Sequence, residues 1–247
     1  MRRLALALIA VAVCAGCGDD DDGGNPRLVV SAASSMTEAL RACSRSFDGA
    51  DVRLSFAGSD ELAAQIRQGV KPDVYAAANT KLPDELNKEG LLSKPVDFAT
   101  NELVIAVPKD SEIRSVEDLA SDGVKLAIGS ESVPIGSYTR ELLAGLPRAQ
   151  PASILANVRS NEPDVKGIVG KLTQGAVDAG FVYVTDVMAA SEELRAVKLP
   201  ADLEPEVTYA AGVVKGAKQP AEARDFVDGL RHGGCADALE QAGFGAP

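Results

Sequence analysis

The sequence contains very little histidine. His232 is the one histidine among 247 residues, and it lies in a polar RHGG segment near the end of the chain. A serine–histidine–aspartate triad needs a histidine base, and the G-x-S-x-G motif of many hydrolases is absent as well. Scarce histidine also argues against a zinc site, although a metal site made of carboxylates stays open. We therefore expect a protein that is not an enzyme and has no cofactor.

Basic residues are outnumbered by acidic ones. The chain has 25 Lys and Arg against 36 Asp and Glu, which gives a formal net charge of −11. Proteins that bind nucleic acid neutralise phosphates with cations, so we expect no nucleic-acid partner. Part of the acidity is the run DDDD at 19–22, so the rest of the chain is less extreme. Beyond the first residues, no apolar run approaches the length of a membrane-spanning helix.

The N-terminal segment has the organisation of an export signal. MRR is a positive n-region, and LALALIAVAV is apolar but too short to span a membrane. The following CAGC resembles a bacterial lipobox, which implies cleavage before Cys17 and a lipid on its thiol. The alternative is ordinary secretion with cleavage at a nearby small residue. We expect a lipoprotein signal peptide at 1–17, a disordered acidic tether at 18–26, and an exported protein held by lipid on the extracytoplasmic side of the cell membrane.

Two cysteines lie beyond the signal, Cys43 and Cys235. An exported protein occupies a compartment in which disulfides persist, and two cysteines allow one bridge. Two buried free thiols are the alternative, because free cysteine is common in protein cores.

The chain after the tether alternates between β-rich runs and helical patterns. Near-continuous apolar strands alternating with helices are typical of parallel sheets that are covered on both faces. Strands are expected at 27–33, 51–58, 72–79, 102–110 and 206–216, with a further strand starting near 178, and helices at 36–47, from Asp60, at 134–146 and at 163–175. The pattern predicts two α/β lobes, with the chain crossing between them near 101–107 and 206–213.

One local feature recurs: a strand, a turn of Gly, Ser or Pro, and then a helix start. It occurs at 31–36, 55–61, 129–135 and, more weakly, 160–165. Such junctions lie at the carboxyl ends of strands, where α/β proteins bind ligands, and each helix start presents free N–H groups and positive dipole. Four of them around one crevice would surround a small anion. Taken singly, each serine is more simply a helix cap, and SMTE at 35–38 fits a capping box.

These junctions resemble the molybdate-binding proteins of bacterial ABC importers, which are type II periplasmic binding proteins. AASSMTEAL is similar to the family's opening segment, and LSFAGSDELAAQIRQG is similar to its second serine segment. Five further segments follow in the family's order: KPDVYAAAN, NELVIAVPK, LAIGSESVPIGSYTRELL, DVKGIVGKLTQGAVDAGFVYVTDV and LEQAGF. The resemblance covers about residues 27–245, and its specificity lies in the order and spacing of the segments.

The resemblance implies a two-lobed α/β fold in which each lobe is a mainly parallel sheet flanked by helices, with the ligand cleft between the lobes. Lobe I would comprise 27–102 plus 211–247, and lobe II 103–210. The implied function is capture of molybdate or tungstate by a monomer that delivers it to an ABC permease in the membrane. The alternative is the same fold with another anion, such as sulfate, phosphate or an organic anion.

The family's oxyanion ligands fall on Ser35, Ser59, Ile135, Val165 and Tyr183. Ile135 and Val165 would bind through backbone N–H groups, and molybdenum would be present only as bound molybdate. A buried dianion needs many donors, and hydroxyls, a phenol and helix-start amides supply them without a countercharge. Such a site has no acceptor for a protonated anion, which favours molybdate, tungstate or sulfate over hydrogen phosphate.

The resemblance leaves some local assignments open. Ser34 is adjacent to Ser35 and is an alternative ligand. Ile135 stands where a smaller residue such as Ala is often found in the family. Lys166 and Arg140 lie near two of the segments, but helical direction could place them outside the site.

The resemblance also bears on the two cysteines. In the family both chain ends belong to the same lobe, and the first and last helices pack together. Cys43 falls in the first helix and Cys235 in the last. A disulfide between them is therefore implied, and it would add roughly 2–4 kcal/mol of stability.

Overall fold

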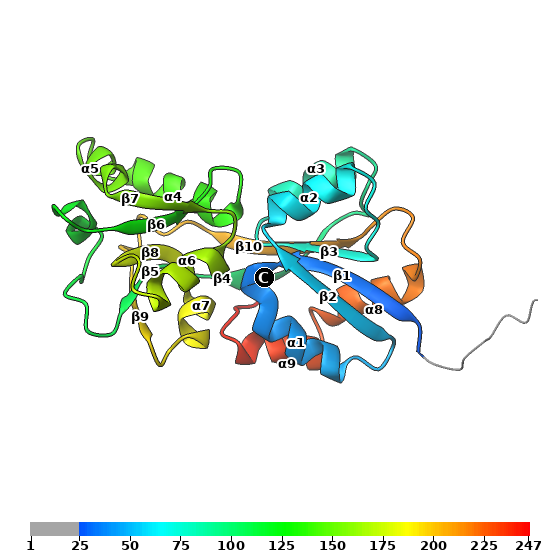
Figure 1. The fold of residues 1–247 in the computed structure, drawn as a ribbon. Coiled ribbons are helices and arrows are strands. Elements are labelled where there is room, and N and C mark those ends of the chain that lie inside the picture. Colours follow the sequence, from blue (N-terminus) through cyan, green and yellow to red (C-terminus); the bar gives the residue numbers. More distant parts are fainter. Residues whose placement is uncertain (1–24) are drawn as a thin grey trace, which may run out of the picture.

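The computed structural model describes residues 25–247, which form two lobes that each contain a five-stranded sheet (Figure 1). The strands of lobe I are β1 (Arg27–Ala33), β2 (Asp51–Ala57), β3 (Val74–Ala77), β4 (Val96–Asn101) and β10 (Val207–Val213). The strands of lobe II are β5 (Leu103–Pro108), β6 (Leu126–Gly129), β7 (Val158–Glu162), β8 (Ala179–Tyr183) and β9 (Leu194–Val197). The strand orders are β2-β1-β3-β10-β4 and β7-β6-β8-β5-β9.

Helices cover both faces of each sheet. Lobe I has a 3-10 turn η1 (Ser34–Met36) and the helices α1 (Thr37–Ser46), α2 (Ser59–Arg67), α3 (Lys81–Lys88), α8 (Pro220–Gly229) and α9 (Gly234–Gln241). Lobe II has a 3-10 turn η2 (Glu117–Ala120) and the helices α4 (Pro134–Gly145), α5 (Gln150–Ala156), α6 (Val165–Thr173) and α7 (Val184–Ala189). Figure 1 shows α2 and α3 on one side of the lobe I sheet and α1, α8 and α9 on the other.

Both sheets are mixed. β1 pairs in parallel with β2 and β3, while β10 is antiparallel to β3 and β4. In lobe II, β6 pairs in parallel with β7 and β8, while β5 is antiparallel to β8 and β9. The antiparallel pairs involve the strands that lead into and out of each lobe at the crossings. The prediction of two α/β lobes with mainly parallel sheets is confirmed: in each sheet four strands run in one direction, and only β10 or β5 runs against them.

The chain crosses between the lobes twice. The first crossing lies at Glu102, between β4 and β5, and the second lies between β9 and β10. β10 begins at Val207 and belongs to the lobe I sheet, so the expected boundary after residue 210 falls inside a strand. By sheet membership we place the return boundary before Val207. The segment KLPADLEPE at 198–206, which joins β9 to β10, is polar and contains two prolines, a linker signal that the expected boundary did not use.

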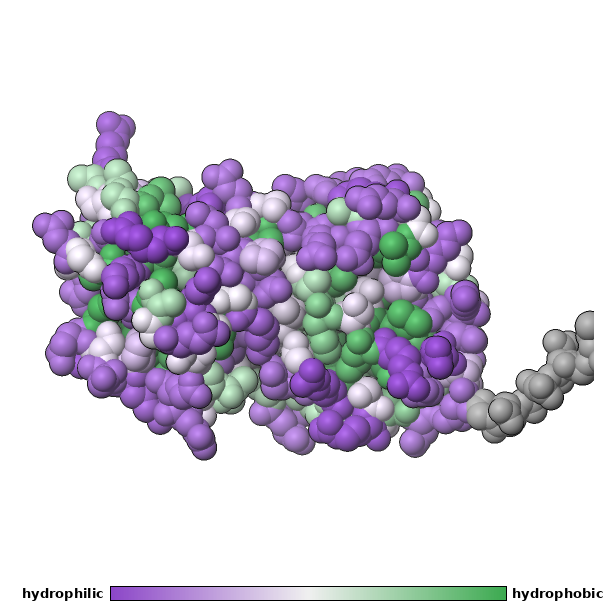
Figure 2. Space-filling view, in the orientation of Figure 1, coloured by the Kyte–Doolittle hydropathy of each residue, from purple (hydrophilic) through white to green (hydrophobic). Residues whose placement is uncertain are grey.

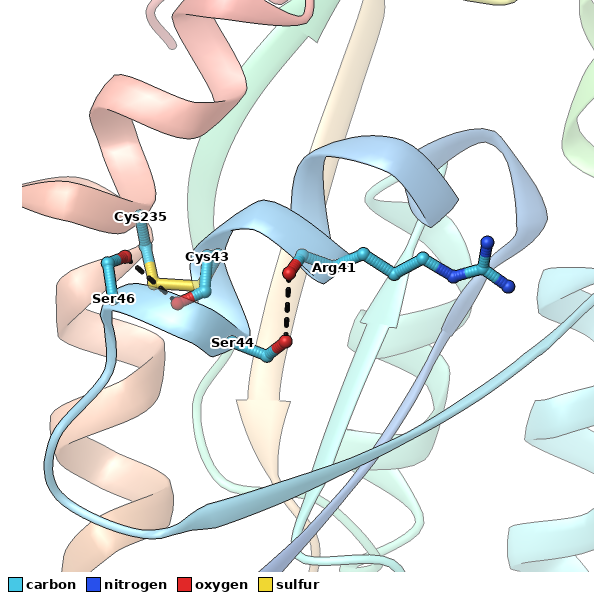
Figure 3. Close-up of a disulfide and its surroundings, with 5 residues drawn as sticks. All are labelled: Arg41, Cys43, Ser44, Ser46 and Cys235. Carbon is cyan, nitrogen blue, oxygen red and sulfur yellow. Dashed lines mark hydrogen bonds between the residues drawn. A yellow bond between two sulfur atoms is a disulfide. The ribbon is translucent and has the colours of Figure 1, made fainter.

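The first and last helices of the described chain pack against each other. Cys43 in α1 and Cys235 in α9 form a disulfide across this contact, at a sequence separation of 192 (Figure 3). The Ser46 hydroxyl donates to the Cys43 carbonyl at 2.9 Å, which closes the end of α1 beside the bridge. Phe47 and Phe226 stack edge to face nearby, with ring centroids 5.3 Å apart. This contact ties both ends of the described chain to lobe I.

The face shown in Figure 2 is mostly hydrophilic, and apolar residues gather there in smaller areas over both lobes. Across residues 25–247, no helix has the length and apolar content needed to cross a bilayer. The expected signal peptide, Cys17 and nearly all of the tether at 18–26 lie outside the described residues.

Candidate functional site

A small cavity of about 20 Å³ lies between the lobes, and all five sequence-predicted site residues line it. Ser35 and Ser59 come from lobe I, whereas Ile135, Val165 and Tyr183 come from lobe II. The other lining residues are Ala33, Ser34, Ala57, Gly58, Ala78, Val133, Pro134 and Asp164. A cavity of this size has room for about one water molecule, so the lobes are closed around it.

Four of the predicted strand-to-helix junctions meet at this cavity. β1 leads into η1, β2 into α2, β6 into α4 and β7 into α6, and residues of each helix start line the cavity. The N–H groups of a first helical turn have no partner within their own helix, and the dipole there is positive. Val165 opens α6, and Ile135 follows the Pro134 that opens α4. The junctions therefore place backbone donors from both lobes around one small volume.

Ser35 does not act as a side-chain cap. Its hydroxyl lies 2.9 Å from the Tyr209 hydroxyl, and the residue is buried. Within residues 25–247, α1 has no side-chain cap hydrogen bond, because η1 intervenes and makes Met36 the cap position. The capping-box interpretation of 35–38 is therefore wrong. Glu38 instead extends to lobe II, where its Oε2 lies 2.9 Å from Lys166 Nζ.

Ser59 is also more than a helix start. It opens α2 after Gly58, and its Oγ accepts a hydrogen bond from the Ala78 N–H at 3.1 Å. The buried Tyr75 hydroxyl donates to the Ser59 carbonyl at 2.7 Å. Because Ser59 Oγ is the acceptor in this contact, the contact does not use the hydroxyl proton, which is free to point elsewhere. Both contacts fix Ser59 at the cavity wall.

Tyr183 brings a hydroxyl that has no hydrogen-bond partner among the described residues. The residue ends β8 and is 1% exposed. Burial raises the pKa of Tyr183 well above its ordinary value, and the neighbouring Tyr209 and Tyr138 add to this effect. The phenol therefore stays protonated and is a donor. An unpaired buried hydroxyl is costly, so its position at a cavity wall calls for an acceptor in the cavity.

The cavity wall contains one charged residue, Asp164, and no Lys or Arg among the described residues. Asp164 caps α6, and its Oδ1 accepts from the Gly167 N–H at 3.1 Å. Lys166 pairs with Glu38, and Arg140 donates to the Gly129 and Gly136 carbonyls. Helical direction thus places both cations outside the site. Sequence reasoning did not single out Asp164, although an Asp directly before a helical pattern is an N-cap signal.

Ile135 fits because a glycine faces it. A β-carbon on Gly129, at the end of β6, would lie 2.6 Å from Ile135 Cγ2. The Ile135 side chain therefore packs where a larger residue at Gly129 would have its side chain.

Ser34 also lines the cavity, so both adjacent serines reach the site.

The described residues offer no metal site and one larger groove. Among residues 25–247, no group of three or more His, Cys, Asp and Glu side chains is arranged to hold a metal ion. A larger groove of about 650 Å³ lies on lobe I, between the ends of β4 and β10 and α8. Its charged residues, such as Lys94, Lys215 and Arg224, are exposed, and lobe II contributes nothing to it. The small cavity is therefore the candidate ligand site.

Comparison with known proteins gives a consistent result. Residues 28–245 match the family of bacterial extracellular solute-binding proteins. The chain is 34% identical to the molybdate-binding protein ModA of Mycobacterium tuberculosis, over 99% of this chain and 98% of the relative. It is 30% identical to YvgL of Bacillus subtilis, which carries the name of an ABC transporter substrate-binding lipoprotein, over 97% and 96% of the two chains. The structure of the Azotobacter vinelandii periplasmic molybdate-binding protein superposes with a TM-score of 0.78 over 89% of this chain and 99% of that one, at 21% identity.

Proposed function

Since the chain belongs to the bacterial extracellular solute-binding proteins and matches a molybdate-binding protein over nearly its full length, we propose that it captures molybdate or tungstate for an ABC importer. This family consists of substrate-binding proteins of transporters and not of enzymes. The proposed ligands are the hydroxyls of Ser35, Ser59 and Tyr183 and the backbone N–H groups of Ile135 and Val165.

The unpartnered hydroxyl of Tyr183 carries this proposal. It is fully buried, it stays protonated, and it lines a cavity in which helix starts also present donors. A buried ligand that accepts from a phenol, two serine hydroxyls and two amides is an anion with several oxygen atoms. Tetrahedral oxyanions have this form.

The absence of cations from the wall of the described site supports a fully deprotonated anion. A Lys or Arg would neutralise charge, whereas this wall offers hydrogen bonds alone. Asp164 is the one charged residue that the described residues contribute to this wall, and its Oδ1 is used as the cap of α6, where it accepts from the Gly167 N–H. Sulfate shares the charge and shape of molybdate, so the alternative ligand of the same kind is sulfate, and size then decides between them.

Closure of the lobes is the proposed capture step. Ser35 and Ser59 lie on one lobe and Tyr183 on the other, so a bound anion favours the conformation that brings them together. A tetrahedral oxyanion is larger than a water molecule, so the lobes must separate to admit it. The closed, loaded monomer is then the form that we propose the permease receives.

We propose that the protein is held at the outer side of the membrane by a lipid on Cys17. The CAGC segment supports this, and so does the lipoprotein name of the B. subtilis relative. Metabolic labelling with a fatty acid tests it. Label in the wild type and none in Cys17→Ala is expected, and equal labelling of both would exclude this anchor.

Calorimetric titration with molybdate tests the proposed ligands. Tyr183→Phe and Ser59→Ala each remove one donor to a buried anion, and each should weaken binding by about 1–3 kcal/mol. Tyr138→Phe is the matched control, because Tyr138 lies on α4 and does not line the cavity. Unchanged affinity in both site variants would exclude these side chains as ligands, and no binding by the wild type of molybdate, tungstate or sulfate would exclude the function.

A further inference from the structure

Asn101, the last residue of β4, has a fixed amide orientation. Its Oδ1 accepts from the Glu102 N–H at 2.9 Å, which identifies the oxygen side of the amide. Its Nδ2 therefore faces the opposite way, where it lies 3.0 Å from Thr185 Oγ1 and 3.3 Å from the Tyr209 hydroxyl. An amide nitrogen donates and does not accept. The Tyr209 oxygen is thus the acceptor in its contact with Asn101.

The hydrogen bond from Asn101 to Tyr209 also determines how Tyr209 contacts Ser35. The Tyr209 side chain is fully buried, and its hydroxyl lies 2.9 Å from Ser35 Oγ. Burial raises the pKa of Tyr209 well above its ordinary value, so the phenol keeps its proton. The buried phenol proton needs an acceptor, the Asn101 amide nitrogen is not one, and Ser35 Oγ is the other hydrogen-bond partner of this hydroxyl among the described residues, so the proton is assigned to Ser35 Oγ. Ser35 accepts it, and its own proton is left for the cavity that it lines.

The second serine of the site is constrained in the same sense. Ser59 Oγ accepts from the Ala78 N–H at 3.1 Å, which leaves its hydroxyl proton free. The hydrogen bonds from Asn101 to Tyr209 and from Tyr209 to Ser35, here called the relay, make Ser35 Oγ an acceptor. The Ala78 N–H does the same for Ser59 Oγ. Each serine therefore has its proton free to donate to a ligand, while one of the two lone pairs of its Oγ is already used.

We infer that Asn101 and Tyr209 are specificity-determining residues that set the proton direction of Ser35, and so bias the site against oxyanions that carry a proton. This inference rests on the proposed oxyanion function. Neither residue lines the cavity, so they act through Ser35 and are positioning residues. A hydrogen phosphate would need an acceptor for its proton, whereas the Tyr209 contact fills one lone pair of Ser35 Oγ and turns the serine proton, a donor, toward the cavity.

Tyr209→Phe tests the relay with little change in shape. The ring packs edge to face against Tyr183, Phe98 and Phe244, and phenylalanine keeps these contacts. The affinity for molybdate should fall about two- to tenfold, because Ser35 is no longer held as a donor. Competition by phosphate near neutral pH should become stronger relative to molybdate, because Ser35 Oγ is now free to accept. Thermal unfolding of the ligand-free variant checks that the fold is retained.

A double-mutant cycle separates the relay from a purely structural role. In a Ser35→Ala background, adding Tyr209→Phe should leave molybdate affinity and the molybdate-to-phosphate ratio unchanged within about twofold. Losses that simply add, or an unchanged ratio in Tyr209→Phe alone, would overturn the inference. Failure of the proposed function can be told apart from failure of the relay, because the wild type would then bind none of these anions. In that case the inference fails as well.

Discussion

Lys166 in lobe II and Glu38 in lobe I form an ion pair across the cleft, with Nζ 2.9 Å from Oε2. The same Nζ lies 3.4 Å from Oδ1 of the buried Asp186, so the lysine links a helix start of lobe I to the interior of lobe II. The pair exists only while the lobes are closed. It therefore contributes to closure, although neither residue lines the ligand cavity.

Glu38→Gln should weaken molybdate binding about two- to fivefold, because a partly exposed pair contributes little but is lost on opening. The remaining affinity should depend less on salt concentration. Glu89→Gln is the matched control, since Glu89 pairs with Arg67 within lobe I at 2.8 Å. Calorimetry at low and high salt checks both variants. An equal loss of affinity in the control would show that the Glu38 effect has nothing to do with closure.

Gly58→Ala should block closure, and within lobe I it requires only that the Asp60 side chain move, because the added β-carbon would lie 2.9 Å from Asp60 Oδ1. Gly58 has φ −60° and ψ 139°, which alanine adopts readily, so no backbone strain is expected. A β-carbon there would overlap the Pro163 carbonyl oxygen of lobe II. Affinity for molybdate should fall at least about tenfold, with the unfolding temperature of the ligand-free protein nearly unchanged.

Gly170→Ala provides the comparison for Gly58→Ala. Gly170 lies inside α6, and a β-carbon there meets only Gln174 Nε2 at 3.9 Å. Alanine should keep the affinity and raise stability by up to about 1 kcal/mol. Normal affinity in Gly58→Ala would mean that the ligand-bound lobes do not approach as closely as they do here.

Removal of the disulfide should separate stability from binding. Cys43 and Cys235 both lie in lobe I and do not line the cavity. The double variant Cys43→Ser, Cys235→Ser should lose about 2–5 kcal/mol of unfolding free energy and keep its molybdate affinity. Urea unfolding and calorimetry on the same preparation check both parts. A large loss of affinity in a variant that is still folded would contradict the independence of bridge and site.

The buried carboxyl of Asp186 should make stability depend on pH. Burial raises the pKa of Asp186 from an ordinary value of 3.8 to about 7, and Lys166 opposes this rise. Between these values the folded state holds a proton that the unfolded state has lost, so stability contributed by this group falls as pH rises from about 4 to 7. The free energy of unfolding should fall through this group by at most about 1.4 kcal/mol per pH unit.

Asp186→Asn removes this titration and keeps an oxygen that can accept from the Tyr183 N–H, which contacts Asp186 Oδ2 at 3.3 Å. The stability of the variant relative to the wild type should therefore increase with pH over the same range. Urea unfolding at several pH values between about 4 and 8 measures the difference. A difference that is constant across the range would show that Asp186 is charged in the folded protein throughout.

Local sequence patterns predicted the strand-to-helix junctions of the site. The residues that favour a turn and a helix start lie within a few positions of each other in the sequence. They correctly predicted the helix starts at Ser59, Pro134 and Val165. The same chemistry misled at Ser35, where SMTE fits a capping box but a 3-10 turn precedes α1. Local pattern alone does not distinguish a helix that begins at once from one that begins after such a turn.

The contacts that the sequence did not predict join residues that are distant along the chain. Tyr209 contacts Ser35 across 174 positions, and Lys166 contacts Glu38 across 128. Tyr209 looks like any apolar strand residue in the sequence, because its neighbours on the chain are apolar and its function depends on β10 returning to lobe I. For the same reason no local pattern marked β5 and β10 as the strands that run against the others, since strand direction depends on where the chain crosses between the lobes.

The central claim is that the cavity between the lobes holds a molybdate or tungstate anion. A crystal of the protein grown with molybdate, measured at the molybdenum absorption edge, tests this claim most directly. We predict one anomalous peak in the cavity, with the anion's oxygen atoms within hydrogen-bond reach of the Ser35, Ser59 and Tyr183 hydroxyls and the Ile135 and Val165 N–H groups. An anomalous peak elsewhere, such as in the groove beside α8, or no peak at a saturating molybdate concentration, would contradict this claim.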